Sequence, residues 1–186
     1  MTAIQTGSKS VLLVVDAQVG VIQGAWDAPR IVKNIALAVE KARSQGVPVI
    51  WVQHADAELV YGSPEWEWAP ELVPADGEVR IYKQFNSSFE NTPLADELAR
   101  LGAAHIVLAG AATNWCIRAT AYAALERGFD LTLIKDGHTT GTIEFQDGTK
   151  IEAADIIREL NIAMQWLSYP GRANKTVAAE ELSFSV

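Results

Sequence analysis

The chain has 186 residues and a mass of 20.2 kDa, a size typical of one domain with a single core. Hydrophobic residues make up 49% of it and charged residues 20%, which excludes bulk disorder because enough apolar surface is present to offset the entropy of ordering. The formal net charge of -8 disfavours binding to the phosphate backbone of nucleic acids. We therefore expect one globular domain over residues 1–186.

The beginning of the chain carries no secretion pattern. Its first ten residues are polar, and Asp16 follows directly on the first apolar run, Val11 to Val15. This excludes an apolar signal segment, and no run reaches the ~18 apolar residues of a membrane-spanning helix. We expect a cytoplasmic protein without a membrane partner. The one cysteine, Cys116, has no partner for an internal disulfide and must be explained by packing or by chemistry.

Short apolar runs alternate with stretches of helical period along the chain, which is typical of βαβ units that form a parallel sheet. The sequence predicts strands at Val11 to Val15, Val47 to Val52, Glu78 to Tyr82, His105 to Leu108 and Asp130 to Ile134. It predicts helices at Arg30 to Gln45, Pro93 to Leu101, Asn114 to Arg127 and Ile151 to Leu167. A weak pattern in the tail, Ala173 to Val186, indicates a sixth strand. The expected fold class is α/β.

Three stretches have no regular pattern. The longest, Ala55 to Gly77, is long for a connection between a strand and a helix and is rich in aromatic residues, which favours a binding loop. The alternative is a surface flap packed on its own tryptophans. The shorter stretches, Gly20 to Pro29 and Gly137 to Gly148, belong to the same edge of the predicted sheet.

Four reactive side chains follow the predicted strands. Asp16, His54, Lys83 and Cys116 each come at or just after the carboxyl end of a different strand. Ligands of open parallel sheets bind beyond this edge, so the topology is expected to bring these four residues together.

Cys116 is the candidate nucleophile. It falls in the first turn of a predicted helix, where unpaired amides and positive potential lower the pKa of a thiol. The small residues of Gly110 to Thr113 bring backbone amides to the same point, and the amides of Ala112 and Cys116 are candidates for an oxyanion hole. Thr113 is expected to cap the helix. The alternative is that Cys116 is a small buried hydrophobic residue.

Asp16 and Lys83 supply the matching charges. A carboxylate that closes an apolar strand is partly desolvated, which raises its pKa and suits it to take a proton from a nearby thiol. An ammonium between Asp16 and Cys116 would hold both groups and stabilise developing negative charge. The alternatives are a loop-stabilising aspartate and a solvated surface lysine.

Four motifs resemble those of one known family, the isochorismatase-like cysteine hydrolases, over about Val11 to Leu167. They are Val14-Val15-Asp16-Ala17-Gln18; Lys83-Gln84-Phe85-Asn86-Ser87-Ser88-Phe89 with Thr92 and Leu94; Gly110-Ala111-Ala112-Thr113-Asn114-Trp115-Cys116-Ile117 with Thr120-Ala121; and Lys135-Asp136-Gly137. The resemblance implies a three-layer α/β/α fold with a six-stranded, mostly parallel Rossmann-like sheet. It also implies a triad of Asp16, Lys83 and Cys116, a thioester intermediate, a cis peptide between Ala111 and Ala112, and a homodimer or homotetramer.

The departures from the family pattern bear on chemistry. Metal-binding members carry an Asp-x-His and a second histidine after the second strand, whereas Val52-Gln53-His54 offers one histidine, so we expect neither metal nor cofactor. Members that cleave a vinyl ether commonly lack the cysteine, so Cys116 favours hydrolysis of an amide or carbamoyl C–N bond in a small molecule. Vinyl-ether hydrolysis, a non-catalytic binding module and a scaffold protein remain as alternatives.

The residues expected to bind the substrate come mainly from the aromatic loop and the strand ends. For Trp115, packing beneath the helix is an alternative, and His54 is expected at the pocket wall or in packing. The expected set is Gln18, Trp26, His54, Tyr61, Trp66, Trp68, Phe85 and Trp115.

Overall fold

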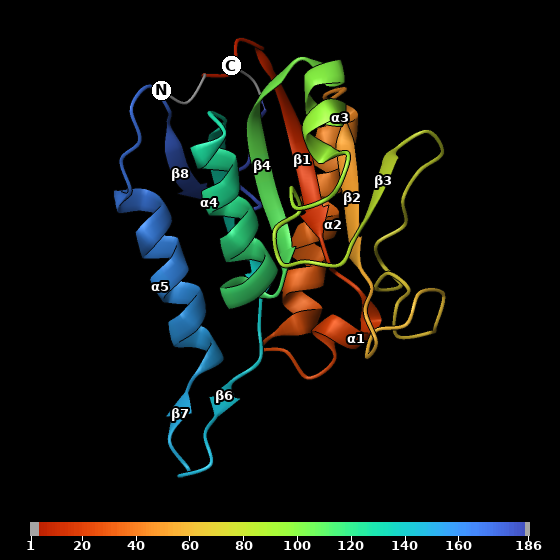
Figure 1. The fold of residues 1–186 in the computed structure, drawn as a ribbon, viewed down its shortest axis with the longest axis vertical. Coiled ribbons are helices and arrows are strands. Elements are labelled where there is room, and N and C mark those ends of the chain that lie inside the picture. Colours follow the sequence, from red (N-terminus) through yellow and green to blue (C-terminus); the bar gives the residue numbers. More distant parts are fainter. Residues whose placement is uncertain (1–3, 185–186) are drawn as a thin grey trace.

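The computed structural model describes residues 4–184; residues 1–3 and 185–186, at the two ends of the expected domain and its tail, lie outside the described residues. One six-stranded sheet dominates it, in the order β3-β2-β1-β4-β5-β8, and every neighbouring pair is parallel (Figure 1). The strands are β1 (Lys9–Val15), β2 (Val49–His54), β3 (Val79–Lys83), β4 (Ala103–Ala111), β5 (Asp130–Thr139) and β8 (Asn174–Val177). The predicted α/β class is confirmed, and β8 is the sixth strand predicted in the tail.

Helices cover both faces of this sheet. On one face, α2 packs with the C-terminal tail in a core cluster that includes Ile31 and Ile35. The opposite face is covered by α3, α4 and α5, whose Leu98, Ala121 and Leu160 belong to a second cluster (Figure 1). The three-layer arrangement is therefore confirmed. The helices are α1 (Val19–Ile22), α2 (Ala28–Ser44), α3 (Leu94–Leu101), α4 (Arg118–Glu126) and α5 (Ala153–Trp166).

Burial on both faces explains the continuous apolar sequence of the central strands. Val11 to Val15 of β1 are all 0% exposed, and a strand covered on both sides reads as a continuous apolar run instead of an alternating one. α2 buries one stripe, from Ile31 to Ala42, at the spacing of a helix. None of the described helices is long and apolar enough to cross a membrane.

The largest differences from the predicted elements lie between Asn114 and Ile151. The predicted helix from Asn114 starts instead as a π-helical turn, η1 (Thr113–Ile117), which continues into α4. Strand β5 runs on to Thr139, because a bulge at its pairing with β4 absorbs the residues that read as the start of a loop.

The expected loop up to Gly148 contains a small hairpin of β6 (Ile143–Glu144) and β7 (Lys150–Ile151), which extends away from the sheet (Figure 1). Its turn is closed by Asp147, whose carboxylate accepts hydrogen bonds from the amide and hydroxyl of Thr149.

Candidate active site

The carboxyl edge of the sheet gathers the four reactive residues. Asp16 follows β1, His54 ends β2, Lys83 ends β3, and Cys116 lies in η1 just after β4. Because the strands stand in the order β3-β2-β1-β4, their ends form one continuous row. The expected convergence is present in the structure.

Lys83 is the centre of this row. Its side chain is completely buried, and its ammonium lies 2.5 Å from Asp16 Oδ2, 3.2 Å from Cys116 Sγ and 3.2 Å from His54 Nδ1. The ammonium hydrogen-bonds to Cys116 and His54 and forms an ion pair with Asp16. Lys83 is thus a fixed cation between the carboxylate and the thiol, and not the solvated surface charge that was the alternative.

Asp16 is held in an unusual backbone conformation. Its φ is +49°, in the left-handed region that residues other than glycine rarely adopt and that often marks functional sites. Its side chain is buried, and Oδ1 accepts no hydrogen bond from an amide or hydroxyl of the described residues. Burial raises the pKa of this carboxyl, as predicted, although the Lys83 ammonium opposes the shift. The carboxylate therefore keeps a lone pair suited to receive a proton.

The predicted lowering of the Cys116 pKa is wrong. Burial, followed by the negative charge of Asp16, raises the pKa of the Cys116 thiol to about 12, and Lys83 offsets only part of this. The thiol is 9% exposed, and desolvation disfavours its anion more than the end of a single π-helical turn stabilises it. At neutral pH the resting Cys116 is therefore a thiol.

The backbone before Cys116 is shaped for close approach. Gly110 has φ of +129°, and a Cβ at this position would collide with the carbonyl oxygen of Val15 on β1, so only glycine fits. The peptide between Ala111 and Ala112 is cis, as the resemblance implies. Both features lie directly before the turn that carries the nucleophile, and the oxyanion-hole roles of Ala112 and Cys116 stay a prediction.

Thr113 does not cap the helix as expected. Ala112 occupies the cap position without a side-chain hydrogen bond, while the Thr113 hydroxyl lies 2.9 Å from Nδ1 of His138 on β5. The other ring nitrogen of His138 lies 3.1 Å from Asn161 Oδ1, and the amide nitrogen of Asn161 donates to the carbonyl oxygen of Lys135. Since the Asn161 oxygen can only accept, His138 carries its proton on Nε2 and accepts from Thr113.

His138 is completely buried. Burial lowers the pKa of its imidazole to about 4, so the ring is neutral at physiological pH. It links the turn that carries Cys116 to α5 through Thr113 and Asn161. We interpret His138 as a positioning residue for the nucleophile.

His54 lies in a chain of contacts at the wall of the site. Its Nδ1 accepts from Lys83, and its Nε2 lies 3.0 Å from Asp56 Oδ2. Gln18 is buried behind it: its amide donates to the carbonyl oxygens of His54 and Trp66, and its oxygen accepts from the His54 amide. Gln18 thus ties the aromatic loop to β2 instead of facing a substrate.

A cavity of about 290 Å³ adjoins Lys83 and is lined by Tyr61, Tyr82 and Phe85. The ring of Tyr61 packs at 4.5 Å from that of Trp66 and 5.4 Å from that of Tyr82. Tyr61 and Phe85 thus line a cavity beside Lys83, and their contact with a substrate stays a prediction. Trp66 is buried beneath them and supports the wall.

The other three predicted tryptophans lie apart from this cavity. Trp68 packs edge-on against Trp51, with ring centres 5.0 Å apart, beside the core cluster of α2. Trp26 is partly exposed beneath the guanidinium of Arg30. Trp115 is 56% exposed, so the alternative of core packing is wrong.

Sequence reasoning missed three residues of this region: Asp56, Tyr82 and His138. Asp56 and Tyr82 stand next to predicted residues and were detectable as neighbours of His54 and Lys83. His138 gave no such signal, because β5 was expected to end four residues earlier, at Ile134.

Comparison with known proteins decides the family. The family model of the isochorismatase domain matches residues 10–158. The chain belongs to the isochorismatase family. Within that family, an isochorismatase of known structure from Pseudomonas putida KT2440 superposes with a TM-score of 0.83 and 26% identity, covering 95% of this chain and 93% of that one. The recognised family and its fold are thereby confirmed.

Two characterised relatives add names to the comparison. Streptothricin hydrolase from Streptomyces noursei is 31% identical over 144 residues, which cover 74% of this chain and 57% of that protein. Maleamate amidohydrolase from Pseudomonas putida is 36% identical over 89 residues, which cover 47% of this chain and 42% of that protein. The matched regions thus span less than two thirds of either relative. Both relatives are hydrolases, and their names give different substrates.

Proposed function

We propose that this protein is a cysteine-dependent amidohydrolase that cleaves a C–N bond, of the amide or carbamoyl type, in a small molecule. The observation that carries the proposal is the contact of one buried ammonium, on Lys83, with both Asp16 and Cys116, at 2.5 Å and 3.2 Å. The name of the related maleamate amidohydrolase supports the choice of an amide bond.

The raised pKa of Cys116 defines the first step. A thiol with a pKa of about 12 is not ionised in advance, so its proton must leave as the sulfur attacks the substrate carbonyl carbon. Asp16 takes this proton, as a general base. The negative charge that develops on the carbonyl oxygen is stabilised by backbone amides, for which Ala112 and Cys116 are the candidates.

Collapse of the tetrahedral intermediate breaks the C–N bond. Asp16 returns the proton to the leaving nitrogen, which departs as a neutral amine or ammonia, and the acyl group remains on sulfur as a thioester. Water then attacks the thioester while Asp16 takes its proton, and the thiol is released with that proton. Lys83 stays charged throughout and opposes the build-up of negative charge between Asp16 and Cys116.

We further propose that the cavity beside Lys83 receives part of the substrate. Its volume of about 290 Å³ is at the small end of ligand sites, and the rings of Tyr61, Tyr82 and Phe85 offer flat apolar walls. A small planar substrate fits these walls. We therefore propose a small, planar substrate in addition to the expected type of bond.

The test is the hydrolysis of a panel of small amides and carbamoyl compounds by the wild-type protein and by Cys116→Ala. We expect kcat/KM of every substrate to fall by at least about 10³-fold in the variant, while the unfolding temperature stays unchanged. Intact-mass measurement after acid quenching should show one acyl group on the wild-type chain and none on Cys116→Ala. Because Cys116 is the one cysteine of the sequence, any thioester is assigned without ambiguity.

Two outcomes would contradict the proposal. Hydrolysis of a vinyl ether such as isochorismate that survives Cys116→Ala would favour the vinyl-ether alternative. A Cys116 thiol that alkylating reagents reach only after unfolding, together with no hydrolysis of any panel member, would favour a non-catalytic protein.

A further inference from the structure

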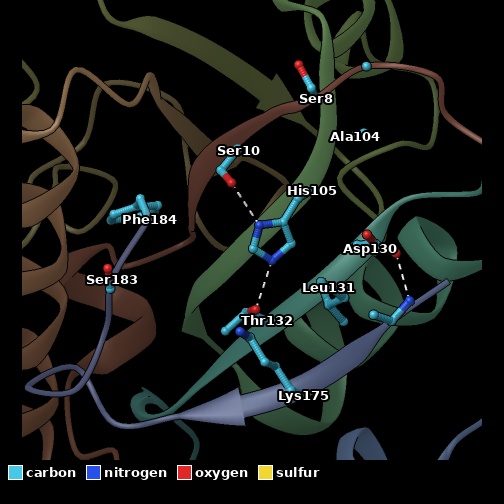
Figure 2. Close-up of a pocket in the computed structure, with 12 residues that line it drawn as sticks. Ser8, Ser10, Ala104, His105, Asp130, Leu131, Thr132, Lys175, Ser183 and Phe184 are labelled. Carbon is cyan, nitrogen blue, oxygen red and sulfur yellow. Dashed lines mark hydrogen bonds between the residues drawn. The ribbon is translucent and has the colours of Figure 1, made fainter. Parts of the chain in front are cut away.

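A second cavity lies at the opposite edge of the sheet, where the strands begin. It has a volume of about 310 Å³ and is lined mainly by polar residues of β1, β4, β5 and β8 and by the tail residues Ser183 and Phe184 (Figure 2). Ser10 and Asp16 are six steps apart along the chain through β1, which puts this cavity roughly 20 Å from the candidate active site. It is therefore distinct from the site of the proposed hydrolysis.

The floor of this cavity is polar where the rest of the sheet face is apolar. Ser10, His105 and Asp130 stand side by side in the register of β1, β4 and β5, so their side chains point to the same face. Two positions further along β1 and β4, Leu12 and Val107 are buried in the core on this face. Two positions beyond Asp130 on β5, Thr132 pairs with Lys175 of β8 and adds two polar residues on this face. Aliphatic residues at these positions would extend the core, so the polar row needs another explanation.

Three of these residues form a hydrogen-bonded chain. Ser10 Oγ lies 2.8 Å from His105 Nδ1, and His105 Nε2 lies 2.8 Å from Thr132 Oγ1 (Figure 2). Burial lowers the pKa of His105, so its ring is neutral and has one N–H to donate and one nitrogen to accept. One hydroxyl must donate to the ring and the other accept from it. The accepting hydroxyl, on Ser10 or Thr132, keeps its own proton for a further partner.

Opposite charges flank this chain. Lys175 extends from β8 toward Thr132 (Figure 2), and its ammonium has no ion-pair or hydrogen-bond partner among residues 4–184. On the other side, Asp130 uses Oδ1 to accept from the amide of Ala173, at 2.7 Å, which leaves Oδ2 for another donor. The cavity therefore offers a cation, an anion and a neutral hydroxyl donor within one small volume.

We propose that this cavity binds a small zwitterion of the α-amino acid type. The carboxylate of the ligand pairs with the Lys175 ammonium and accepts from the free hydroxyl of the Ser10–His105–Thr132 chain. The ammonium of the ligand donates to Asp130 Oδ2. Lys175 is exposed and Asp130 is half-buried, so both are open to a ligand, and only a zwitterion pairs with the two charges at once.

The experiment titrates the ¹⁵N-labelled full chain with L-alanine and follows the backbone amides by NMR. Propionate and ethylammonium are the matched probes, since each lacks one of the two charged groups. We expect saturable shifts at Ala104 and Leu131, which line the cavity, and affinities for the two half-molecules that are lower by about tenfold or more. The amides around Gly110, at the candidate active site, should not shift.

Two variants in the cavity and one control complete the test. Lys175→Met and Asp130→Asn keep the size of each side chain, and each should weaken L-alanine binding by about tenfold, while the exposed control Lys33→Met on α2 should leave it unchanged. Binding of propionate or ethylammonium as tight as that of L-alanine would overturn the zwitterion assignment. Absence of saturable shifts up to about 50 mM L-alanine, or equal affinity in both cavity variants, would overturn the site.

Discussion

The two edges of the sheet each hold a chain of three polar side chains, but they are built differently. At the carboxyl edge, Lys83 joins Asp16 to Cys116, with the charges completely buried and Asp16 at φ of +49°. At the amino edge, His105 joins the hydroxyls of Ser10 and Thr132, next to an irregularity in the pairing of β1 with β4 between Lys9 and Ser10. The carboxyl edge thus combines a buried ion pair with a residue in the left-handed region, whereas the amino edge combines neutral hydrogen bonds with a local shift of strand register.

The difference teaches where the molecule is most sensitive to change. Removing one partner of a buried ion pair leaves an uncompensated charge and typically costs about 3–5 kcal/mol. Loss of one neutral hydrogen bond costs about 1 kcal/mol. Substitutions at the carboxyl edge should therefore disturb both activity and stability, whereas those at the amino edge should be mild.

The strongest test of this contrast is Asp16→Asn. It removes the proposed base, so kcat/KM should fall by at least about 10³-fold. It also removes the negative charge that raises the thiol pKa, so the thiol pKa should fall and alkylation by iodoacetamide at pH 8 should become faster. Parallel activity and alkylation assays measure the two effects, which have opposite directions.

Lys83→Met is the matched comparison for that experiment. The Lys83 ammonium lowers the thiol pKa, so its removal should slow alkylation and also reduce turnover. If Asp16→Asn slowed alkylation as well, the electrostatic account of this site would be wrong. The stability of both variants should be measured by chemical denaturation alongside these assays, because either substitution leaves a buried charge without its partner.

The irregular backbone itself is tested by Gly110→Ala. The added methyl group collides with the carbonyl oxygen of Val15, at a φ of +129° that L-residues rarely adopt, so the free energy of unfolding should drop by about 4 kcal/mol or more. Gly141 is the control, because a Cβ there meets no atom within 4 Å. Urea denaturation of both variants measures the difference, and equal losses would refute the close-approach argument.

A smaller effect is the pH dependence that His138 contributes. Its folded pKa of about 4 lies below the ordinary value of 6.5, so the unfolded chain takes up the proton first. Stability from this group is complete above pH 6.5 and is lost as the pH falls toward 4, by about 2 kcal/mol between pH 7 and pH 5. His138→Gln should remove this part of the pH dependence of the free energy of unfolding. Urea denaturation of the wild type and the variant at pH 7 and pH 5 measures it.

His105→Gln sharpens the comparison between the two edges. The pKa of His105 is lowered in the same direction, but the ring is less deeply buried than that of His138. Its removal should flatten the slope less. An equal or larger change for His105→Gln would show that burial does not set the order of the two histidines.

The sequence located the strands of the sheet, most clearly β1 and β2, whose apolar runs are buried on both faces. It also located Asp16, Lys83 and Cys116, since parallel strands bring their carboxyl ends to one edge. The rest was harder, because the chain from Thr113 to Ile151 includes a π-helical turn and a hairpin that projects from the sheet (Figure 1). Such features depend on long-range contacts, not on local periodicity.

The prediction of a lowered pKa for Cys116 was wrong for the same reason. A helix start is a local signal and favours the thiolate, whereas the burial that raises the pKa arises from distant segments that pack around η1. The side chain of Trp115 likewise faces outward because of the geometry of that turn. Local sequence therefore identified the reacting atoms but not their resting protonation.

The protonated state of Cys116 has a consequence for the life of the protein under oxidative stress. Peroxides attack thiolates, not thiols, and a thiol with a pKa of about 12 presents almost no thiolate to them. If Cys116 is the nucleophile that we propose, it should resist oxidants at rest and react once a carbonyl group lies beside it. The burial that disfavours the anion would then also protect the sulfur atom that the proposed reaction uses.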